Sequence, residues 1–434
     1  MNLLIKNARV IDPQRKIDEK LDILIENSRI KKIAKGIKIS KHKTVDAKDK
    51  IVVPGLIDMH VHLREPGRED EETIYTGSLA AINGGFTTVV CMANTNPPLD
   101  TEQDIDFIYS ESKRLNLIDI FPVAAVTKGL RQEELTEVAK LKKAGAVALS
   151  DDGYTIKDSN LLRHALEYAK MYNLIIISHC EEPNLSRGGV MNEGYMSTLL
   201  GLKGIPCASE SIIVARDIEL ARLTNTHIHF AHISCKESVD LLRRAKEDGV
   251  NITAETCPHY FTLSDEDLKN YNTNLKMYPP LRTKKDIQAI KEGLADGTID
   301  VITTDHAPHL ESEKDLEFDN APFGMIGLET SLGASYRLVE DKVLSIKELV
   351  EKMSVNPARI LDLNKGKLKE GELADITIID PDKDWVVKKE DFESKSKNSG
   401  FIGMKLGAKA HSVISSGRLV MENGNRALIK TKGR

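Results

Sequence analysis

Eight short apolar segments recur along residues 56–304, and this repetition constrains the fold more than any other feature of the chain. Each segment is rich in β-branched and aromatic residues and is short enough to be one buried strand. Longer amphipathic segments lie between most of them, as helices do between the strands of a parallel sheet. Eight such units predict an α/β fold, a TIM-like (β/α)₈ barrel. The predicted strands are Leu56–His62, Phe86–Met92, Ile118–Val126, Ala146–Ser150, Leu174–His179, His227–His232, Asn251–Cys257 and Ile299–Thr304.

Four of the intervening segments show the spacing of apolar residues that is typical of a helix with one buried face. The predicted helices are Gln132–Ala144, Asn160–Met171, Ser209–Arg222 and Ser234–Asp248.

The two ends of the chain read as short strands with turns between them. Because chain termini often lie close together, we expect both ends to form one small β-sandwich domain beside the barrel. The predicted division is residues 1–53 for the N-terminal part of the sandwich, 54–363 for the barrel and 364–434 for the C-terminal part. Within the last part, we expect the charged segment Lys383–Lys397 to be a solvated loop.

The composition argues against several classes of function. A net charge of −5 without a basic block gives no sign of a nucleic-acid or membrane surface. No apolar run reaches the roughly 20 residues that cross a bilayer. Charged residues interrupt the first apolar stretch, so we expect no secretory signal peptide and a cytoplasmic protein. The five cysteines include no C-x-x-C pair and are expected to be packing residues.

Residues that can bind a metal follow most of the predicted strands. His60 and His62 alternate in an extended segment, so their side chains point the same way. Catalytic groups of a barrel lie at the C-terminal ends of its strands, where these histidines would meet the others. Histidine and carboxylate ligands suit zinc or a similar metal, which lowers the pKa of bound water toward ~7. The candidates are His60, His62, Asp151, Asp152, His179, His232, Asp305 and His306.

Several histidines have a second interpretation. His179 ends an apolar run and can equally be a core residue with satisfied hydrogen bonds. His227 and His229 share a strand with His232, and we favour His232 as the ligand because it stands at the strand's end. His259 is expected to be structural or to support a ligand.

The aspartates also leave a choice. Asp151 and Asp152 both precede Gly153, so one of them can be a turn residue. Asp305 would lie beside a metal-bound water and could act as a general base.

Longer motifs add to these single positions. They are His60–Gly67 (HVHLREPG), Met92–Pro98 (MANTNPP), Ser150–Gly153 (SDDG), Thr304–His309 (TDHAPH), Ala321–Glu329 (APFGMIGLE), Ser394–Asn398 (SKSKN) and Phe401–Gly403 (FIG). Over nearly the whole chain they resemble the amidohydrolase superfamily and, within it, the dihydroorotases of the bacterial type I group. This resemblance implies the reversible ring closure of N-carbamoyl-L-aspartate to L-dihydroorotate in de novo pyrimidine (UMP) biosynthesis.

The resemblance also implies roles for the candidate residues. One or two Zn²⁺ ions per subunit are expected, with the binuclear form favoured. One ion would be held by His60, His62 and Asp305, a second by His179 and His232, and Asp152 would bridge them. Asp305 would also carry the catalytic proton. The substrate would be bound by His62, Arg64, Asn94, His309, Phe323 and Gly324, the last two through their backbone.

Two positions separate this chain from relatives. Many members of the superfamily use a carboxylated lysine of the fourth strand as the bridging ligand, but Ala146–Ser150 contains none. The bridging carboxylate is therefore expected from Asp152. The family usually has Asn where this chain has Tyr278, which leaves open whether that position contacts the substrate through its side chain.

Two other functions remain open. One is a different cyclic amidohydrolase, such as a hydantoinase or dihydropyrimidinase, against which Arg64 and the missing lysine argue. The other is an inactive scaffold for aspartate carbamoyltransferase, against which the retained ligands argue, because unpaired polar groups are costly to bury. We expect a homodimer and leave association of an active enzyme with aspartate carbamoyltransferase open. The polar segment Leu310–Asn320 is expected to be a mobile loop over the site.

Overall fold

The structure is a computed structural model that describes residues 2–40 and 42–427. Its centre is a barrel of eight parallel strands that pair in chain order, with each strand inside its predicted range. A parallel bridge between Val61 and His306 brings the first strand against the segment after the last one. The strands are β6 (Leu56–Val61), β7 (Phe86–Cys91), β8 (Asp119–Ala124), β9 (Ala148–Leu149), β10 (Ile176–Ser178), β13 (Ile228–Phe230), β14 (Ile252–Thr256) and β15 (Val301–Ile302). The predicted barrel is confirmed, and burial of its strands on both faces explains their continuous apolar runs.

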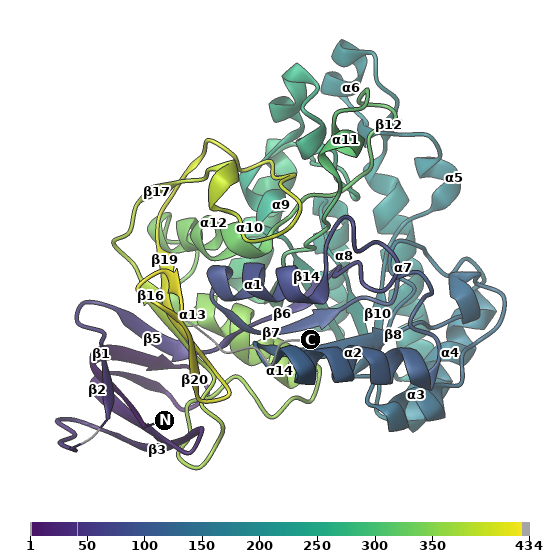
Figure 1. Cartoon of the computed structure of the whole chain (residues 1–434). Helices are drawn as coiled ribbons and strands as arrows, with labels where there is room; N and C mark the ends of the chain where they lie inside the picture. The colour runs from purple at the N-terminus through teal and green to yellow at the C-terminus, as the bar shows by residue number, and fades with distance from the viewer. Residues whose placement is uncertain (1, 41, 428–434) are drawn as a thin grey trace.

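Helices surround the barrel (Figure 1). In α4 (Ser159–Met171), Asp158 caps the first turn, because its carboxylate accepts hydrogen bonds from two backbone N–H groups. One face of α4 is buried, and Leu162, Ala165, Leu166 and Ala169 form it at helical spacing. The other helices around the barrel are α1 (Ile74–Gly84), α2 (Glu102–Leu115), α3 (Val138–Ala144), α7 (Cys207–Thr224), α8 (Lys236–Glu247), α10 (Lys284–Asp296), α12 (Leu328–Glu340), α13 (Ile346–Val350) and α14 (Asn356–Ile360).

The predicted helix Gln132–Ala144 is wrong in its first half, since α3 begins only at Val138. Gln132 has a φ of 64°, a left-handed conformation that a right-handed helix cannot contain. A β-bridge between Thr127 and Leu135 holds this part as an irregular loop. The other three predicted helices are confirmed, with ends that differ by a few residues.

Both ends of the chain contribute to a second sheet, as predicted. β5 pairs with β1 on one side and with β16 on the other, which joins the two ends. The sheet is continuous. At its far edge, the Ile30 N–H donates to the Glu372 carbonyl and the Gly371 N–H donates to the Ile30 carbonyl, which ties β3 to the segment before β16. Its two halves enclose one apolar core. The strands are β1 (Leu3–Asp12), β2 (Ile17–Glu26), β3 (Arg29–Ala34), β4 (Lys43–Asp46), β5 (Ile51–Pro54), β16 (Ile376–Asp380), β19 (Lys409–Ser415), β20 (Arg418–Glu422) and β21 (Asn425–Arg426).

The segment Lys383–Lys397 is not the solvated loop that its charge suggested. It leaves the end sheet through β17 (Trp385–Val386), which pairs with β18 (Lys405–Leu406), and reaches the barrel. From Phe392 to Asn398 every second side chain is buried. Two of these are serines: Ser394 donates to the Glu72 carboxylate, and Ser396 Oγ donates to the Glu71 carbonyl at 2.7 Å.

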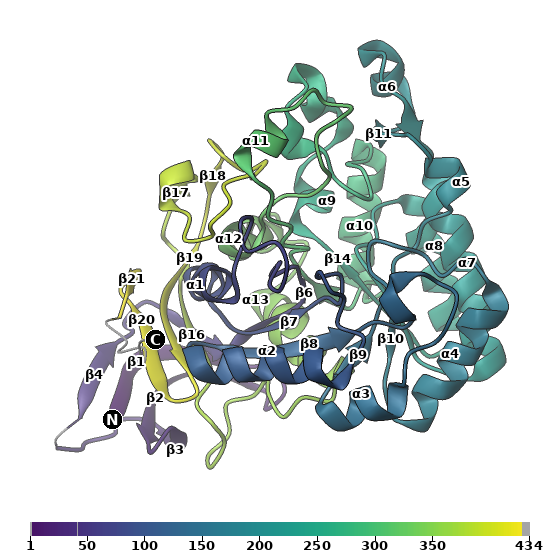
Figure 2. The same cartoon turned by 45° about the vertical axis from the view of Figure 1, so that its right-hand side comes forward.

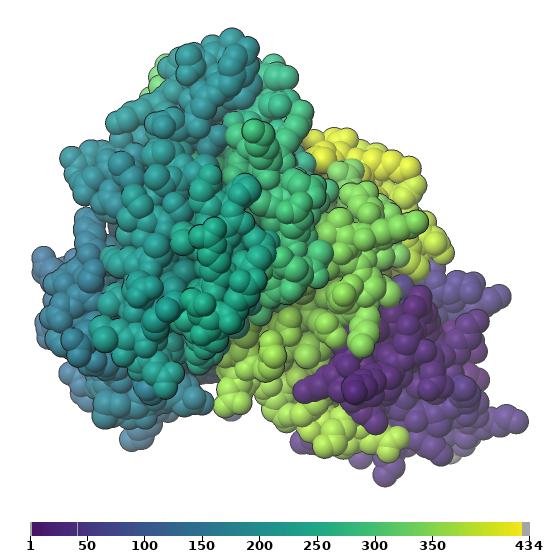
Figure 3. Space-filling view, turned by 180° about the vertical axis from the view of Figure 1, so that it is seen from behind, coloured from purple at the N-terminus to yellow at the C-terminus, as the bar shows by residue number. Residues whose placement is uncertain are grey.

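The short elements lie in the loops that follow the barrel strands. Figures 1 and 2 show α6 and α11 at the top of the molecule, away from the end sheet. Seen from behind in Figure 3, the N-terminal strands lie at one end, next to the C-terminal part. In the described residues, no helix is long and apolar enough to cross a membrane. The short elements are α5 (Pro183–Ser186), α6 (Tyr195–Leu200), α9 (Pro258–Thr262), α11 (Glu311–Lys314), β11 (Met191–Asn192) and β12 (Gly204–Ile205).

Candidate active site

The ends of five barrel strands bring six predicted metal ligands together. His60 lies in β6, and the others follow β6, β9, β10, β13 and β15 within three residues. Each of the six is at most 6% exposed. His232 and Asp305 have φ values of 34° and 48°, which residues other than glycine adopt rarely and mainly where function requires it. The six residues are His60, His62, Asp152, His179, His232 and Asp305.

Asp152 lies at the centre of this cluster. Its Oδ1 atom lies 3.4 Å from His60 Nε2, 3.6 Å from His179 Nδ1 and 3.5 Å from His232 Nε2. Asp305 Oδ1 lies 2.9 Å from His62 Nε2 and 3.6 Å from His60 Nε2. The donor atoms of His60, His62 and Asp305, and those of His60, Asp152 and His232, lie within 4.8 Å of one another. The cluster thus offers two adjacent groups of ligands that share His60.

Unpaired polar atoms show that this cluster fits a metal. Among the described residues, His60 Nε2 and Asp152 Oδ1 are buried and have no hydrogen-bond partner, although they face each other. Buried polar groups are rarely left unpaired. A cation between these atoms would satisfy them, and nitrogen with carboxylate oxygen is a donor set for a first-row transition metal.

The charges of the cluster agree with this interpretation. Burial alone would lower the pKa of His60, but the charges of Asp152 and Glu255 outweigh it and raise the pKa well above the usual value. Burial would raise the pKa of Asp152, yet the surrounding histidines lower it well below its usual range. The carboxylates therefore require a nearby positive charge, which either histidine protons or a metal ion can supply.

Two further carboxylates support the histidines from behind. Glu255 Oε1 lies 2.5 Å from His60 Nδ1, and its Oε2 lies 3.1 Å from His229 Nε2. Glu181 Oε2 lies 3.3 Å from His179 Nε2. A carboxylate on one ring nitrogen fixes the orientation of the ring and leaves the other nitrogen to a metal. The sequence analysis missed both residues.

The predicted substrate residues border the cluster. Predicted metal ligands and predicted substrate residues together line a cavity of about 220 Å³. Arg64 Nε lies 3.1 Å from the Glu71 carboxylate, and His309 Nδ1 lies 3.0 Å from the same carboxylate, so Glu71 orients both side chains. Asn94 Oδ1 lies 2.9 Å from His62 Nδ1. The lining includes His62, Arg64, Asn94, Asp152, His179, His232, Tyr278, Asp305, His309, Phe323 and Gly324.

Gly324 allows a close approach at this cavity. Its φ is +114°, and a Cβ atom added there would lie 2.7 Å from Ala307 Cβ. Only glycine fits this conformation and spacing. The backbone of Phe323 and Gly324 is therefore held against the segment that carries Asp305.

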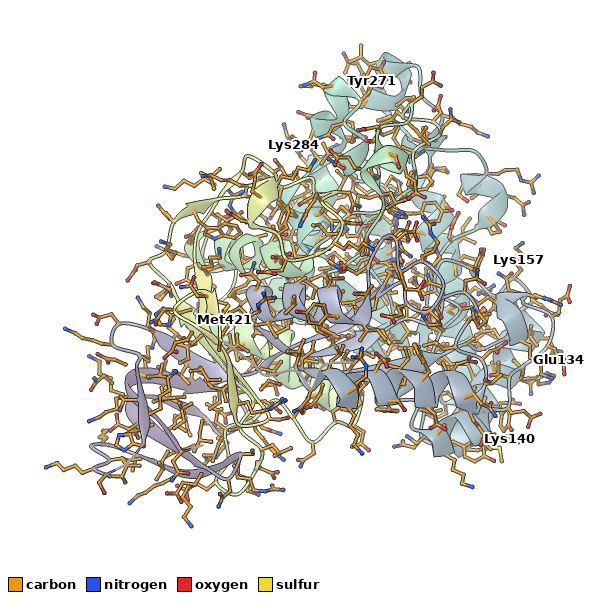
Figure 4. All side chains as sticks on the ribbon, viewed as in Figure 1. Glu134, Lys140, Lys157, Tyr271, Lys284 and Met421 are labelled. Atoms are coloured by element: carbon orange, nitrogen blue, oxygen red, sulfur yellow. The ribbon has the colours of Figure 1, made fainter. Side chains whose placement is uncertain are left out.

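An outer groove of about 660 Å³ adjoins the cavity. The lining carries more cations than acids, which favours the entry of an anionic ligand. One of the cations, Lys157, is labelled near the right edge of Figure 4. The charged lining residues are Lys157, Arg187, Lys203, Lys276, Glu181 and Asp319.

Other polar residues named from the sequence lie outside the cluster. The Asp151 carboxylate accepts hydrogen bonds from the backbone N–H groups of Val126 and Thr127, so Asp151 is the turn residue of the pair. His227 Nε2 and His229 Nδ1 both contact the Thr253 hydroxyl at 2.8 Å.

Two more of these histidines also lie outside the cluster. His306 pairs with Glu72 at 3.4 Å. His259 is 1% exposed and lies behind the site, and burial lowers its pKa to about 3.

Tyr278 was left out of the predicted site but lines the cavity. Its ring stacks on His179, with centroids 5.7 Å apart, and its hydroxyl donates to Glu181. The segment Leu310–Asn320 contains α11 and borders a hollow beside Arg64, and its mobility stays a prediction.

Comparisons with known proteins agree with this geometry. A family profile described as "Dihydro-orotase-like" matches residues 49–238. The dihydroorotase of Geotalea daltonii is 53% identical over 97% of this chain and 99% of its own length. The dihydroorotase of Geobacter metallireducens is 52% identical over the same shares of the two chains.

A solved structure shows the same fold. The L-hydantoinase (dihydropyrimidinase) from Arthrobacter aurescens superposes with a TM-score of 0.88 at 24% identity, covering 100% of this chain and 98% of that one. This likeness concerns the fold alone. About half of the residues, by contrast, are identical to those of the dihydroorotases from end to end. The chain belongs to the dihydroorotase family.

Proposed function

We propose that this protein is a dihydroorotase that interconverts N-carbamoyl-L-aspartate and L-dihydroorotate by closing and opening a cyclic amide. This is a step of de novo pyrimidine biosynthesis. The observation that carries the proposal is a single cavity of about 220 Å³ that joins a buried cluster of metal ligands to Arg64. An arginine in that place selects a substrate that carries a carboxylate next to the amide.

The proposed cofactor is Zn²⁺, with two ions per subunit favoured. His60, His62 and Asp305 would hold one ion, His179 and His232 the other, and Asp152 would lie between them. Such an ion supplies a Lewis acid and lowers the pKa of water to about 7.

Asp305 is proposed to move the proton. Its carboxylate faces the cavity and can accept a proton from the attacking water and return it to the amide nitrogen that leaves. Asp305 Oδ1 lies 2.9 Å from His62 Nε2, so the two residues are placed to hold the same ion.

Arg64, Asn94 and His309 are proposed to hold the substrate carboxylate. Their side chains come from three separate loops, yet all three line the cavity. Glu71 and the carbonyl of Pro308 fix the guanidinium of Arg64, so little side-chain freedom is lost when substrate binds.

The test is dihydroorotate hydrolysis, followed by ultraviolet absorbance, together with metal analysis of wild type and Asp305→Ala. We expect a wild type that contains zinc and turns over. The variant should lose at least 10²-fold in kcat, the usual share of a general base.

Arg64→Lys tests the substrate. It should raise KM for dihydroorotate more than it lowers kcat, because lysine cannot form the two parallel hydrogen bonds. Hydrolysis of dihydrouracil or hydantoin without hydrolysis of dihydroorotate would instead identify a different cyclic amidohydrolase. A wild type that cannot be loaded with metal and does not turn over would favour the scaffold function.

A further inference from the structure

Tyr278 reaches the ligand cluster by two routes, directly by its ring and indirectly through Glu181. We propose that Tyr278 is a positioning residue for His179, acting through the Glu181 carboxylate. This inference rests on the proposed metal centre and adds to it a residue outside the ligand set.

The two nitrogens of His179 face different partners. Nδ1 points into the cluster, 3.6 Å from Asp152 Oδ1 and 3.0 Å from His232 Nε2. Nε2 points away from it, toward Glu181 Oε2 at 3.3 Å. A proton on Nε2 that is shared with Glu181 leaves the lone pair of Nδ1 free for a metal. The orientation of His179 therefore depends on where Glu181 is held.

Tyr278 holds the other oxygen of that carboxylate. Its phenol donates to Glu181 Oε1, while Oε2 serves His179. The Tyr278 ring is itself confined, because it stacks on His179 with an angle of 28° between the planes and lies 4.8 Å from the Phe323 ring. The aromatic ring thus fixes the hydroxyl, and the hydroxyl fixes the carboxylate.

The opposite side of the cluster repeats this arrangement. Glu255 gives one oxygen to His60 Nδ1 and the other to His229 Nε2. In both cases a histidine of the cluster contacts one oxygen of a carboxylate. The second oxygen contacts a further side chain, the hydroxyl of Tyr278 for Glu181 and the ring nitrogen of His229 for Glu255. Glu255 is fully buried, but the side chain of Glu181 is 13% exposed. Of the two carboxylates, Glu181 is therefore the one that needs a neighbouring residue to hold it away from solvent.

The position of Tyr278 supplies that shelter. Tyr278 and Phe323 are the two side chains that line both the inner cavity and the outer groove, so they separate the two spaces. Glu181 lines the outer groove. Without the phenol, its carboxylate could turn away from His179 into this groove of about 660 Å³.

Tyr278→Phe removes only the hydroxyl and keeps the ring. Supporting residues of this kind change metal affinity by about 10- to 100-fold, and we expect about 10-fold weaker zinc binding in this variant. The measurement is zinc retention against a chelator of known affinity, with dihydroorotate turnover recorded in parallel. We expect kcat to fall while KM changes little, since the hydroxyl faces Glu181 and not the substrate residues.

Tyr260→Phe is a matched control. Tyr260 is buried and donates to the Pro279 carbonyl at 2.6 Å, so this variant also loses a phenol hydrogen bond to the same loop. Among the described residues, no hydrogen bond or ion pair joins Tyr260 to Glu181 or His179. Its zinc retention should equal that of the wild type.

Glu181→Gln completes a double-mutant cycle. If Tyr278 acts through Glu181, adding Tyr278→Phe to Glu181→Gln should weaken zinc binding no further. Zinc retention unchanged in Tyr278→Phe, or an effect that adds in full to that of Glu181→Gln, would overturn the inference while leaving an active, zinc-loaded wild type as a dihydroorotase. A wild type that binds no zinc would overturn both the inference and the proposed metal centre.

Discussion

At the scale of single residues, Glu255 shows how the barrel interior prepares the site. It lies within β14 and is fully buried, where an isolated carboxylate would be costly. Burial alone would raise its pKa, but the charge of His60 and the hydrogen bonds from His229 and His60 lower it well below the usual range. Glu255 is therefore ionised at neutral pH and holds His60 in a single orientation.

Glu255→Gln should weaken metal binding. The amide keeps the shape of the carboxylate but loses its charge, so we expect about 10- to 100-fold lower zinc affinity. Zinc titration in a chelator-buffered series measures this effect. Thr253→Val is the control, since Thr253 contacts His229 but not His60. Equal zinc affinity in Glu255→Gln and wild type would show that His60 needs no such support.

The sequence placed the candidate ligands because each stands at the end of an apolar run, a local pattern. Glu255 and Tyr278 carry no such pattern, whereas Glu181 stands two residues after the run Leu174–His179. Glu255 occupies an ordinary strand position, and Tyr278 contacts a residue 97 positions earlier in the chain. Contacts of this kind arise from the closed barrel, so strand periodicity alone could not predict them.

At the scale of elements, the short helix α11 supports the substrate side of the cavity. Lys314 at its end donates to the carbonyls of Pro322 at 2.7 Å and Gly324 at 3.0 Å. These carbonyls flank Phe323, which lines the cavity. Burial lowers the pKa of Lys314 to about 7, and the nearby charge of Lys276 adds to this effect.

Lys314→Met should alter both stability and substrate binding. The folded pKa is about 7 and the ordinary value is 10.5. Between these pH values the unfolded chain binds more protons, so the free energy of unfolding contributed by Lys314 rises with pH across that window. The difference in stability between wild type and Lys314→Met should therefore shift in favour of the wild type from pH 7 to pH 10, as measured by urea unfolding.

In kinetics, Lys314→Met should raise KM for dihydroorotate several-fold more than it lowers kcat, because the loop around Phe323 loses two hydrogen bonds. Lys285→Met, at an exposed position on α10, is the control for the loss of one lysine charge. A pH dependence shared by the two variants would argue against a role for the buried amine.

Elements with a strong apolar period were predictable, and the two errors had local causes. The Gln132–Ala144 segment has a helical pattern, but the bridge between Thr127 and Leu135 holds its first half as a loop. The Lys383–Lys397 segment does have a period of two, yet its buried members include Ser394 and Ser396, which a hydrophobicity pattern does not register. These two serines are buried because their hydroxyls donate hydrogen bonds to Glu72 and Glu71, and not because they make apolar contacts.

At the scale of the whole molecule, strand-like segments at both ends of the chain allowed the prediction of a shared sheet. Its topology was not predictable, because β5 is joined to β16 by pairs more than 300 residues apart in sequence. The connection between sheet and barrel was also not predictable. Lys365 contributes to it, with Nζ 2.6 Å from Asp119 at the start of β8 and 2.6 Å from Asp375 beside β16.

Lys365→Met should loosen the end sheet from the barrel and leave the active site intact. The lysine side chain is 10% exposed and that of Asp375 is 13% exposed, so the variant leaves a mostly buried carboxylate without its cation. Breaking such a pair costs about 3 kcal/mol, whereas Lys236→Met, which removes an exposed pair with Asp240, should change the stability much less. Thermal and urea unfolding measure both.

Because Asp119 lies at the opposite end of the barrel strands from the ligand cluster, zinc retention should not change. Adding Asp375→Asn should recover part of the lost stability, since the uncompensated charge is then gone. Equal losses in the two lysine variants would show that Lys365 adds no more to stability than an exposed ion pair does.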